Sequence, residues 1–182
     1  EKKPINLDFS SSHHLKVINI KIDQEIELFD GKGNFFLAKV KEKNKKNITL
    51  RRCSEINFNI KTKPLINIGI SEIKSFDKIV REACQLGAES ITCLMTNRTK
   101  FSKLPQENKI LRWKSIASNS CEQCGLNWLP EIRAMSLERW IKKTNTEQKI
   151  YLDPHGENKI NELGLFSSID LAIGPEGGFD KD

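Results

Sequence analysis

The feature that most constrains the fold is a regular alternation of apolar runs and helix-like stretches after Pro64. The apolar runs have the length of buried strands and cover residues 65–70, 90–94, 149–152 and 169–173. Strands that alternate with helices usually form a parallel sheet with helices packed against it. The sequence therefore predicts an α/β architecture for most of the chain.

Three helices are expected between these strands. The first begins at Ser75, whose hydroxyl suits an N-cap, and is stopped by Gly87. The second covers residues 108–124 and ends at Gly125, and the third covers residues 136–143. Helical spacing predicts these inward-facing residues: Phe76, Val80, Ala83, Leu111, Ile116, Ala117, Ser120, Cys121, Cys124, Leu137, Trp140 and Ile141.

The first third of the chain has a different rhythm. Apolar and polar residues alternate in short strands separated by polar turns, at residues 25–29, 30–33, 34–41, 43–47 and 48–50. With no convincing helix between them, these strands predict a small β-barrel. Residues 61–64 are a plausible boundary, so we expect two domains, residues 1–62 and residues 63–182.

The net charge of +6 is concentrated in one segment of the predicted barrel. That segment contains one acid, Glu42, and seven basic residues: Lys39, Lys41, Lys43, Lys45, Lys46, Arg51 and Arg52. A cluster of one sign in an otherwise balanced chain is typical of a surface that binds a phosphate backbone. A lysine-rich hairpin that keeps a sheet edge soluble would have the same residues. The sequence leaves both interpretations open.

Composition excludes several classes of protein. No apolar run approaches the length of about 18 residues that a membrane span needs, and no segment has the pattern of a signal peptide. The five cysteines are not spaced as a disulfide framework, which favours a reducing, cytoplasmic compartment. Cys121 and Cys124 form a single CxxC pair without the further ligands that zinc requires, so we expect buried thiols and no metal.

Two predicted strands are followed by loops rich in glycine and proline, residues 153–156 and residues 174–178. Ligands bind at the carboxyl ends of strands in sheets of this kind, and glycine lets the main chain approach a ligand closely. Neither loop fits a dinucleotide fingerprint or a P-loop. A pair of tight turns remains the alternative.

The second loop and its flanks, residues 173–179, resemble the RNA methyltransferases that modify N3 of a uridine in 16S ribosomal RNA, which belong to the SPOUT (trefoil-knot) class. Several other segments are similar to that family in the same order: residues 13–19, 28–31, 86–87, 97–99, 112–113 and 121–131. The resemblance covers nearly the whole chain. It implies an N-terminal PUA-like RNA-binding barrel and a C-terminal knotted α/β domain, where strand pattern alone predicts an unknotted sheet.

The resemblance also implies a cofactor and partners. It implies S-adenosylmethionine, a homodimer, and 16S ribosomal RNA in the assembled small subunit as the substrate. The part of the family's knot that closes the cofactor site is expected beyond Asp182. The residues assigned to the cofactor are Leu152, Pro154, Ile173, Gly174, Pro175, Glu176, Gly177 and Gly178.

RNA contacts are assigned to the seven basic residues above together with Lys16 and Arg98. Arg98 follows a predicted strand and is also the candidate for holding the RNA phosphate or the pyrimidine during catalysis. No residue is assigned as general base, and a lone loop histidine such as His155 is more often a polar surface residue.

The chain departs from the family pattern at Asn19, Glu82 and Leu126. An RNA-binding or assembly protein that keeps the fold without activity is therefore the alternative, and a methyltransferase with another RNA target is a third hypothesis.

Overall fold

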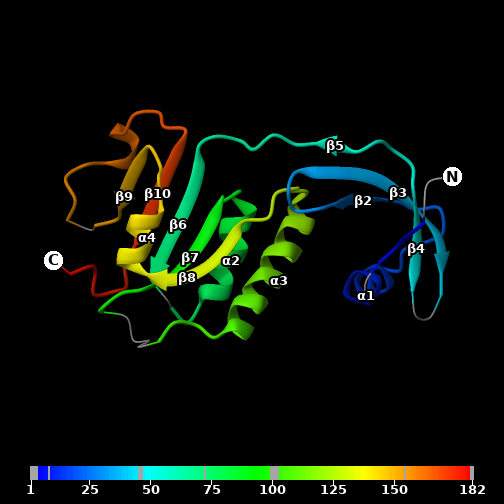
Figure 1. Ribbon diagram of the computed structural model, residues 1–182, viewed down its shortest axis with the longest axis horizontal. Coiled ribbons are helices and arrows are strands. Elements are labelled where there is room, and N and C mark those ends of the chain that lie inside the picture. The colour runs from blue at the N-terminus through cyan, green and yellow to red at the C-terminus, as the bar shows by residue number, and fades with distance from the viewer. Residues whose placement is uncertain are drawn as a thin grey trace. The chain divides into compact units, whose positions relative to one another are not determined.

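The computed structural model describes residues 4–7, 9–44, 47–71, 73–98, 103–153 and 155–180 (Figure 1). The chain forms two compact units, Glu1–Ile60 and Lys61–Asp182. Each unit has its own sheet. Short strands with alternating apolar and polar residues come before the boundary, and apolar strands that alternate with helices come after it. No helix in the described ranges is both long enough and apolar enough to cross a membrane.

The first unit is an antiparallel, barrel-like sheet with one helix. Its elements are β1 (Ile5–Asn6), α1 (Phe9–Val17), β2 (Glu25–Phe29), β3 (Asn34–Lys43), β4 (Ile48–Arg52) and β5 (Asn57–Phe58). The strand order is β1-β4-β3-β2, and β5 pairs with β3. The side chains of Ile20, Ala38, Val40, Ile48 and Leu50 form its buried core. The predicted strands are confirmed, whereas helix α1 was not expected, because its sequence lacks an apolar stripe.

The second unit is built on a parallel sheet. Its strands are β6 (Leu65–Ser71), β7 (Ser90–Met95), β8 (Glu131–Ser136), β9 (Gln148–Tyr151) and β10 (Ser168–Ile173). Its helices are α2 (Phe76–Gln85), α3 (Glu107–Cys124), α4 (Leu137–Lys143) and the 3-10 turn η1 (Ile160–Glu162). The strand order is β8-β7-β6-β10-β9, and every pair is parallel. The predicted α/β architecture is confirmed, with β8 as an additional strand.

The chain order fixes which helices share a face of this sheet. From β6 to β8 the chain steps in one direction, and it then crosses to β9 and β10 on the other side of β6. Because parallel crossovers are right-handed, α2 and α3 lie on one face and α4 lies on the other (Figure 1). The order reverses between β6 and β10, which is where sheets of this kind open a crevice for a ligand.

Helix α4 packs closely on the sheet because Gly69 of β6 leaves room for an indole. A Cβ atom on Gly69 would lie 2.9 Å from ring atoms of Trp140 and 2.9 Å from Leu94 Cδ1. Trp140 joins Leu94, Met135 and Ala172 in a buried cluster on this face. This packing places α4 beside the carboxyl end of β10.

Some helix details differ from the sequence-based expectation. Ser75 occupies the N-cap position of α2, but its side chain accepts no hydrogen bond there. Leu111 and Cys124 of α3 are exposed, whereas Trp113 is fully buried. The predicted Ala117, Ser120 and Cys121 are buried, so the inward face of α3 is the expected one with Trp113 added to it. The indole Nε1 of Trp113 donates to Asp77 of α2 at 2.9 Å.

Candidate functional site

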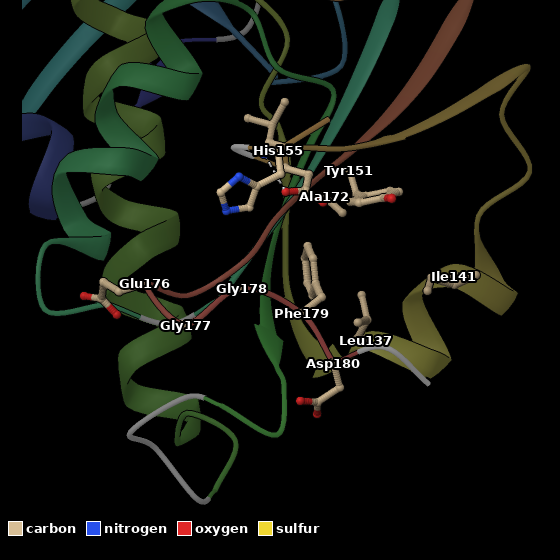
Figure 2. Close-up of a pocket in the computed structure, with 12 residues that line it drawn as sticks. Leu137, Ile141, Tyr151, His155, Ala172, Glu176, Gly177, Gly178, Phe179 and Asp180 are labelled. Carbon is tan, nitrogen blue, oxygen red and sulfur yellow. Dashed lines mark hydrogen bonds between the residues drawn. The ribbon is translucent and has the colours of Figure 1, made fainter. Parts of the chain in front are cut away.

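A cavity of about 610 Å³ opens at the carboxyl ends of β9 and β10 (Figure 2). Its lining comes from three parts of the unit: the end of β9 and the loop after it, β10 and the loop after it, and helix α4. The lining residues are Tyr151, Leu152, Asp153, His155, Ala172, residues 176–180, Leu137 and Ile141. Its position is the one expected for a ligand site in a parallel sheet. Its volume lies in the range of small-molecule and cofactor pockets.

The loop after β10 forms one wall of this cavity and is shaped by its glycines. Gly178 has a φ of +70°, a conformation that favours glycine, and its N–H donates to the Pro175 carbonyl oxygen at 2.8 Å. A Cβ atom on Gly174 would lie 3.3 Å from the Phe179 ring, which is tighter than most contacts. The loop therefore folds back on itself and brings main chain to the cavity.

An aromatic pair lies inside the cavity. The rings of Tyr151 and Phe179 meet edge to face with centroids 6.4 Å apart. Figure 2 shows the Phe179 ring between the strand residues Tyr151 and Ala172 and the helix residue Leu137. Side chains of this kind present an apolar surface suited to the flat face of a base.

The loop after β9 forms the opposite rim. The Leu152 N–H continues the sheet by donating to the Ala172 carbonyl oxygen at 3.0 Å. Asp153 then holds the turn, since its carboxylate accepts from the His155 N–H at 2.9 Å and its carbonyl accepts from the Gly156 N–H at 3.1 Å. Leu152, Asp153 and His155 all line the cavity.

The cofactor residues assigned from the sequence are only partly gathered at this cavity. Leu152, Glu176, Gly177 and Gly178 line it. Figure 2 shows the Glu176 carboxylate pointing away from the aromatic pair. Three further assigned residues, Ile173, Gly174 and Pro175, are described by the structure but do not line the cavity. Pro154 lies outside the described residues.

Sequence reasoning missed the apolar part of the lining: Leu137, Ile141, Tyr151, Ala172 and Phe179. Leu137 and Ile141 are one helical turn apart, a spacing that predicts core packing. Ile141 is in fact 46% exposed. The expected inward direction was wrong for Ile141 because the α4 face beside the loop after β10 is open.

Arg98, in the loop after β7, contacts the loop after β10. Its Nη1 donates to the Gly177 carbonyl oxygen at 2.6 Å, and its Nε lies 2.6 Å from Asp180 Oδ1. Asn97 Nδ2 donates to the other Asp180 oxygen at 2.9 Å. Arg98 is described by the structure but does not itself line the cavity.

The basic segment lies on β3 and β4 of the first unit. In the register of these strands, Lys39 faces Arg51 directly. Their neighbours Ala38, Val40 and Leu50 are buried, so Lys39 and Arg51 point away from the core. Lys45 and Lys46 lie outside the described residues.

The remaining residues of the RNA assignment differ in their surroundings. Lys41 and Lys43 are exposed, and the Lys43 Nζ donates to the Ile20 carbonyl oxygen at 2.9 Å. Arg52 is half-buried, with its guanidinium carbon 5.8 Å from the centroid of the Phe36 ring. Lys16 lies in the last turn of α1.

The cysteines of the second unit form a contact between α2 and α3. The buried thiols of Cys84 and Cys121 share a hydrogen bond, which raises the pKa of Cys84, with burial adding to the effect, and lowers the pKa of Cys121. The other member of the CxxC pair, Cys124, is exposed, so the inward position expected for it was wrong. Among the described residues, no group of three or more Cys, His, Asp or Glu side chains is arranged to hold a metal ion.

Comparison with known protein families gives two matches that divide the chain. An RNA methyltransferase domain matches residues 60–182, and an RNA methyltransferase PUA domain matches residues 8–51. Among curated proteins, a ribosomal RNA small subunit methyltransferase E of Buchnera aphidicola subsp. Acyrthosiphon pisum is 30% identical over 174 residues. That match covers 92% of this chain and 69% of the relative.

Solved structures have the same fold. A methyltransferase of Legionella pneumophila, solved in complex with the cofactor SAM, superposes with a TM-score of 0.86 at 25% identity and covers 98% of this chain and 77% of that one. A ribosomal RNA small subunit methyltransferase E of Neisseria gonorrhoeae, bound to S-adenosyl methionine, superposes with a TM-score of 0.85 at 23% identity. That match covers 98% of this chain and 77% of the other.

Proposed function

Because the chain belongs to the family of ribosomal RNA small subunit methyltransferases E, we propose that it methylates N3 of a uridine in 16S ribosomal RNA. Methylation of ribosomal RNA with S-adenosylmethionine is the activity of this family. The uridine N3 position and the assembled small subunit as substrate are the proposed part. The roles of the two domains are also proposed: residues 1–62 bind RNA, and residues 63–182 catalyse the methyl transfer.

The cavity at the carboxyl ends of β9 and β10 is the observation that carries this proposal. It combines main chain from the loop after β10 with the apolar faces of Tyr151 and Phe179. A nucleoside needs both, since its base has a flat face and an edge of hydrogen-bonding groups. We assign the adenosine of S-adenosylmethionine to this cavity, with Leu152, Gly177 and Gly178 offering main-chain groups to it.

The reaction is an in-line displacement at carbon. The bond between sulfur and the methyl group breaks as the bond between uridine N3 and the methyl group forms, and the N3 proton leaves to solvent or to a base. The sulfonium already activates the methyl group, so the protein contributes mainly by aligning the donor with N3. The uridine must be unpaired and turned out of the stack before N3 becomes accessible.

RNA docking is assigned to the exposed face of β3 and β4. Lys39 lies directly opposite Arg51 of β4 on one side and Glu25 of β2 on the other. Like charges opposite each other destabilise a sheet, and Glu25 supplies one carboxylate for these two cations. A phosphate backbone can supply a further anion. A homodimer remains part of the proposal, by resemblance to the family.

None of the three departures from the family pattern lines the cavity. Glu82 is exposed on α2 and pairs with Lys78 one turn before it. Asn19 belongs to the first unit, and neither it nor Leu126 lines the cavity. This placement favours an active enzyme over a protein that has kept only the fold.

Mass spectrometry of ribosomal RNA tests the proposed position directly. We expect a deletion strain to lack N3-methyluridine in 16S ribosomal RNA, and the full-length protein with S-adenosylmethionine to restore it on small subunits from that strain. Persistence of N3-methyluridine in the deletion strain would overturn the position. Loss of a different modification would favour another RNA target, and no loss together with no calorimetric binding of S-adenosylmethionine would favour a non-catalytic protein.

A further inference from the structure

The loops after β7 and β10 are joined by side chains although their strands are not neighbours in the sheet. Strand β6 lies between β7 and β10, so the connection passes over its carboxyl end. Arg98 and Asn97 supply the donors from the first loop, and Gly177 and Asp180 supply the acceptors from the second. We call this set of four residues the clasp.

The clasp holds both ends of a cavity-lining segment. Gly177, Gly178, Phe179 and Asp180 are consecutive, and all of them line the cavity. Arg98 binds the carbonyl oxygen of the first residue and the carboxylate of the last. Asn97 binds the same carboxylate, which fixes the orientation of the Asp180 side chain between the two donors.

The segment contains two adjacent glycines, and one hydrogen bond within the loop, from the Gly178 N–H to the Pro175 carbonyl oxygen, holds part of its shape. Glycine loses more conformational freedom on ordering than any other residue, so a glycine pair needs an external contact to hold one shape. The planar guanidinium of Arg98 can supply that contact, because its N–H donors point in fixed directions and can bind two acceptors at once.

We propose that Arg98 is a positioning residue for the cofactor, acting through the Gly177 carbonyl and Asp180 to hold the main chain of the cavity wall in its binding shape. This inference rests on the proposed function of the cavity. It differs from the sequence-based expectation, in which Arg98 touches RNA or the pyrimidine. The distinction is testable, since a positioning role changes cofactor binding and an RNA contact changes RNA binding.

The test compares Arg98→Lys and Arg98→Ala with wild type in the full-length protein. Lysine keeps the charge but lacks the fork, so it cannot hold Gly177 and Asp180 together. We expect both variants to raise the Kd for S-adenosylmethionine, measured by calorimetry, by about tenfold to a hundredfold, the range for losing a charge-assisted hydrogen bond. Arg81→Lys, at an exposed site on α2, is the matched control and should leave the Kd unchanged.

A second readout separates the two roles of Arg98. An arginine that contacts phosphate contributes about 0.7–0.9 to the slope of log affinity for RNA against log salt concentration. We expect that slope to stay the same in Arg98→Lys and Arg98→Ala. A decreased slope in Arg98→Ala with an unchanged Kd for the cofactor would overturn the inference in favour of an RNA contact.

Thermal unfolding shows whether each variant folds. If Arg98→Ala does not fold, the Kd of Arg98→Lys for S-adenosylmethionine decides whether Arg98 positions the cavity wall. The result also separates this inference from the proposed function. A wild-type protein that binds no S-adenosylmethionine contradicts the proposed function. A wild type that binds it and an Arg98→Lys variant that binds it equally well contradict only the role of Arg98.

Discussion

At the scale of single residues, the shape of the cavity wall depends on Gly178. Its φ of +70° lies in the left-handed region, and a Cβ atom there would meet nothing within 4 Å. Side-chain crowding is therefore not the constraint at this position; backbone conformation is. An L-residue other than glycine in this region costs about 1–2 kcal/mol.

We expect Gly178→Ala to lower the free energy of unfolding by about 1 kcal/mol and to weaken binding of S-adenosylmethionine. Urea unfolding and calorimetry measure the two effects. Gly164→Ala is the matched control, because Gly164 has no positive φ and its nearest neighbour would be a Phe166 ring atom at 3.9 Å. Equal behaviour of the two variants would show that the loop does not need the left-handed conformation.

The same scale shows where residue-level prediction succeeded and where it stopped. The glycine-rich motif identified the loop, because glycine and proline directly after a buried strand are typical of a loop that approaches a ligand. It did not identify Phe179 or Tyr151 as lining residues, since an isolated aromatic residue has the same pattern in a core and in a cavity. The partners of Arg98 are separated from it by about eighty residues of sequence, and no local pattern reports such a contact.

At the scale of elements, a row of polar side chains crosses the parallel sheet from β7 to β10. The Ser90 hydroxyl donates to Asn67 Oδ1 at 2.7 Å, and Asn67 Nδ2 donates to Asp170 Oδ1 at 2.9 Å. Asp170 is fully buried, and within the described structure its Oδ2 has no hydrogen-bond partner. Asn67 is thus the described side-chain donor to a buried carboxyl group.

We expect Asn67→Leu to lower the free energy of unfolding by about 3 kcal/mol, because it leaves the Asp170 side chain buried without that donor. Urea unfolding gives the value. In the double variant Asn67→Leu/Asp170→Leu, part of the loss should be recovered, since the buried carboxyl group is gone while the buried Ser90 hydroxyl still lacks its Asn67 acceptor. A double variant that is less stable than the single one would show that packing, not polarity, determines the effect.

A second contact between elements makes stability depend on pH. Glu147, just before β9, accepts hydrogen bonds from the hydroxyl and the N–H of Ser167, just before β10. These bonds hold the pKa of Glu147 below its ordinary value. A carboxyl group with a lowered pKa in the folded state stabilises the protein above the pKa of the unfolded state and loses that effect as pH falls through the folded pKa.

We therefore expect wild type to be more stable than Glu147→Gln at neutral pH, with the difference shrinking as pH falls below the ordinary carboxyl range. Thermal unfolding of both proteins between pH 7 and about pH 3 measures the difference. A difference that is constant over this range would mean that the charge of Glu147 does not contribute.

The elements that escaped prediction share a physical reason. Helix α1 has the sequence Phe-Ser-Ser-Ser-His-His-Leu-Lys-Val, in which weak helix formers dominate and no apolar stripe appears. Strand β8 alternates polar and apolar residues but is followed at once by α4, so the two patterns merge. In both cases tertiary packing decides the conformation. The long apolar strands β6, β7 and β10 were predicted nearly to their ends because burial on both faces leaves little choice.

At the scale of the whole molecule, cofactor and RNA are assigned to different units. The cavity belongs to the unit Lys61–Asp182, and the cross-strand pair Lys39 and Arg51 belongs to the unit Glu1–Ile60. Charge patterning predicted the basic segment, since a cluster of one sign needs no three-dimensional information. Whether Lys39 and Arg51 lie opposite each other on neighbouring strands depends on the strand register, which only the structure provides.

We expect Lys39→Gln/Arg51→Gln to weaken RNA binding and to reduce the slope of log affinity against log salt concentration by about 1.4–1.8, as for two lost phosphate contacts. Filter binding over a range of salt concentrations measures the slope. Binding of S-adenosylmethionine should not change. Lys78→Gln/Lys114→Gln, which removes two exposed lysines from α2 and α3, is the matched control; an equal reduction in slope there would contradict a dedicated docking face.

The most direct measurement is a crystal structure of the full-length protein with S-adenosylmethionine. We predict the adenosine in the cavity beside Phe179, with its base edge on main-chain groups of Leu152 and of residues 176–178 and with Arg98 still bound to the Gly177 carbonyl. Adenosine bound elsewhere on the protein, with this cavity closed by its own side chains, would contradict the assignment.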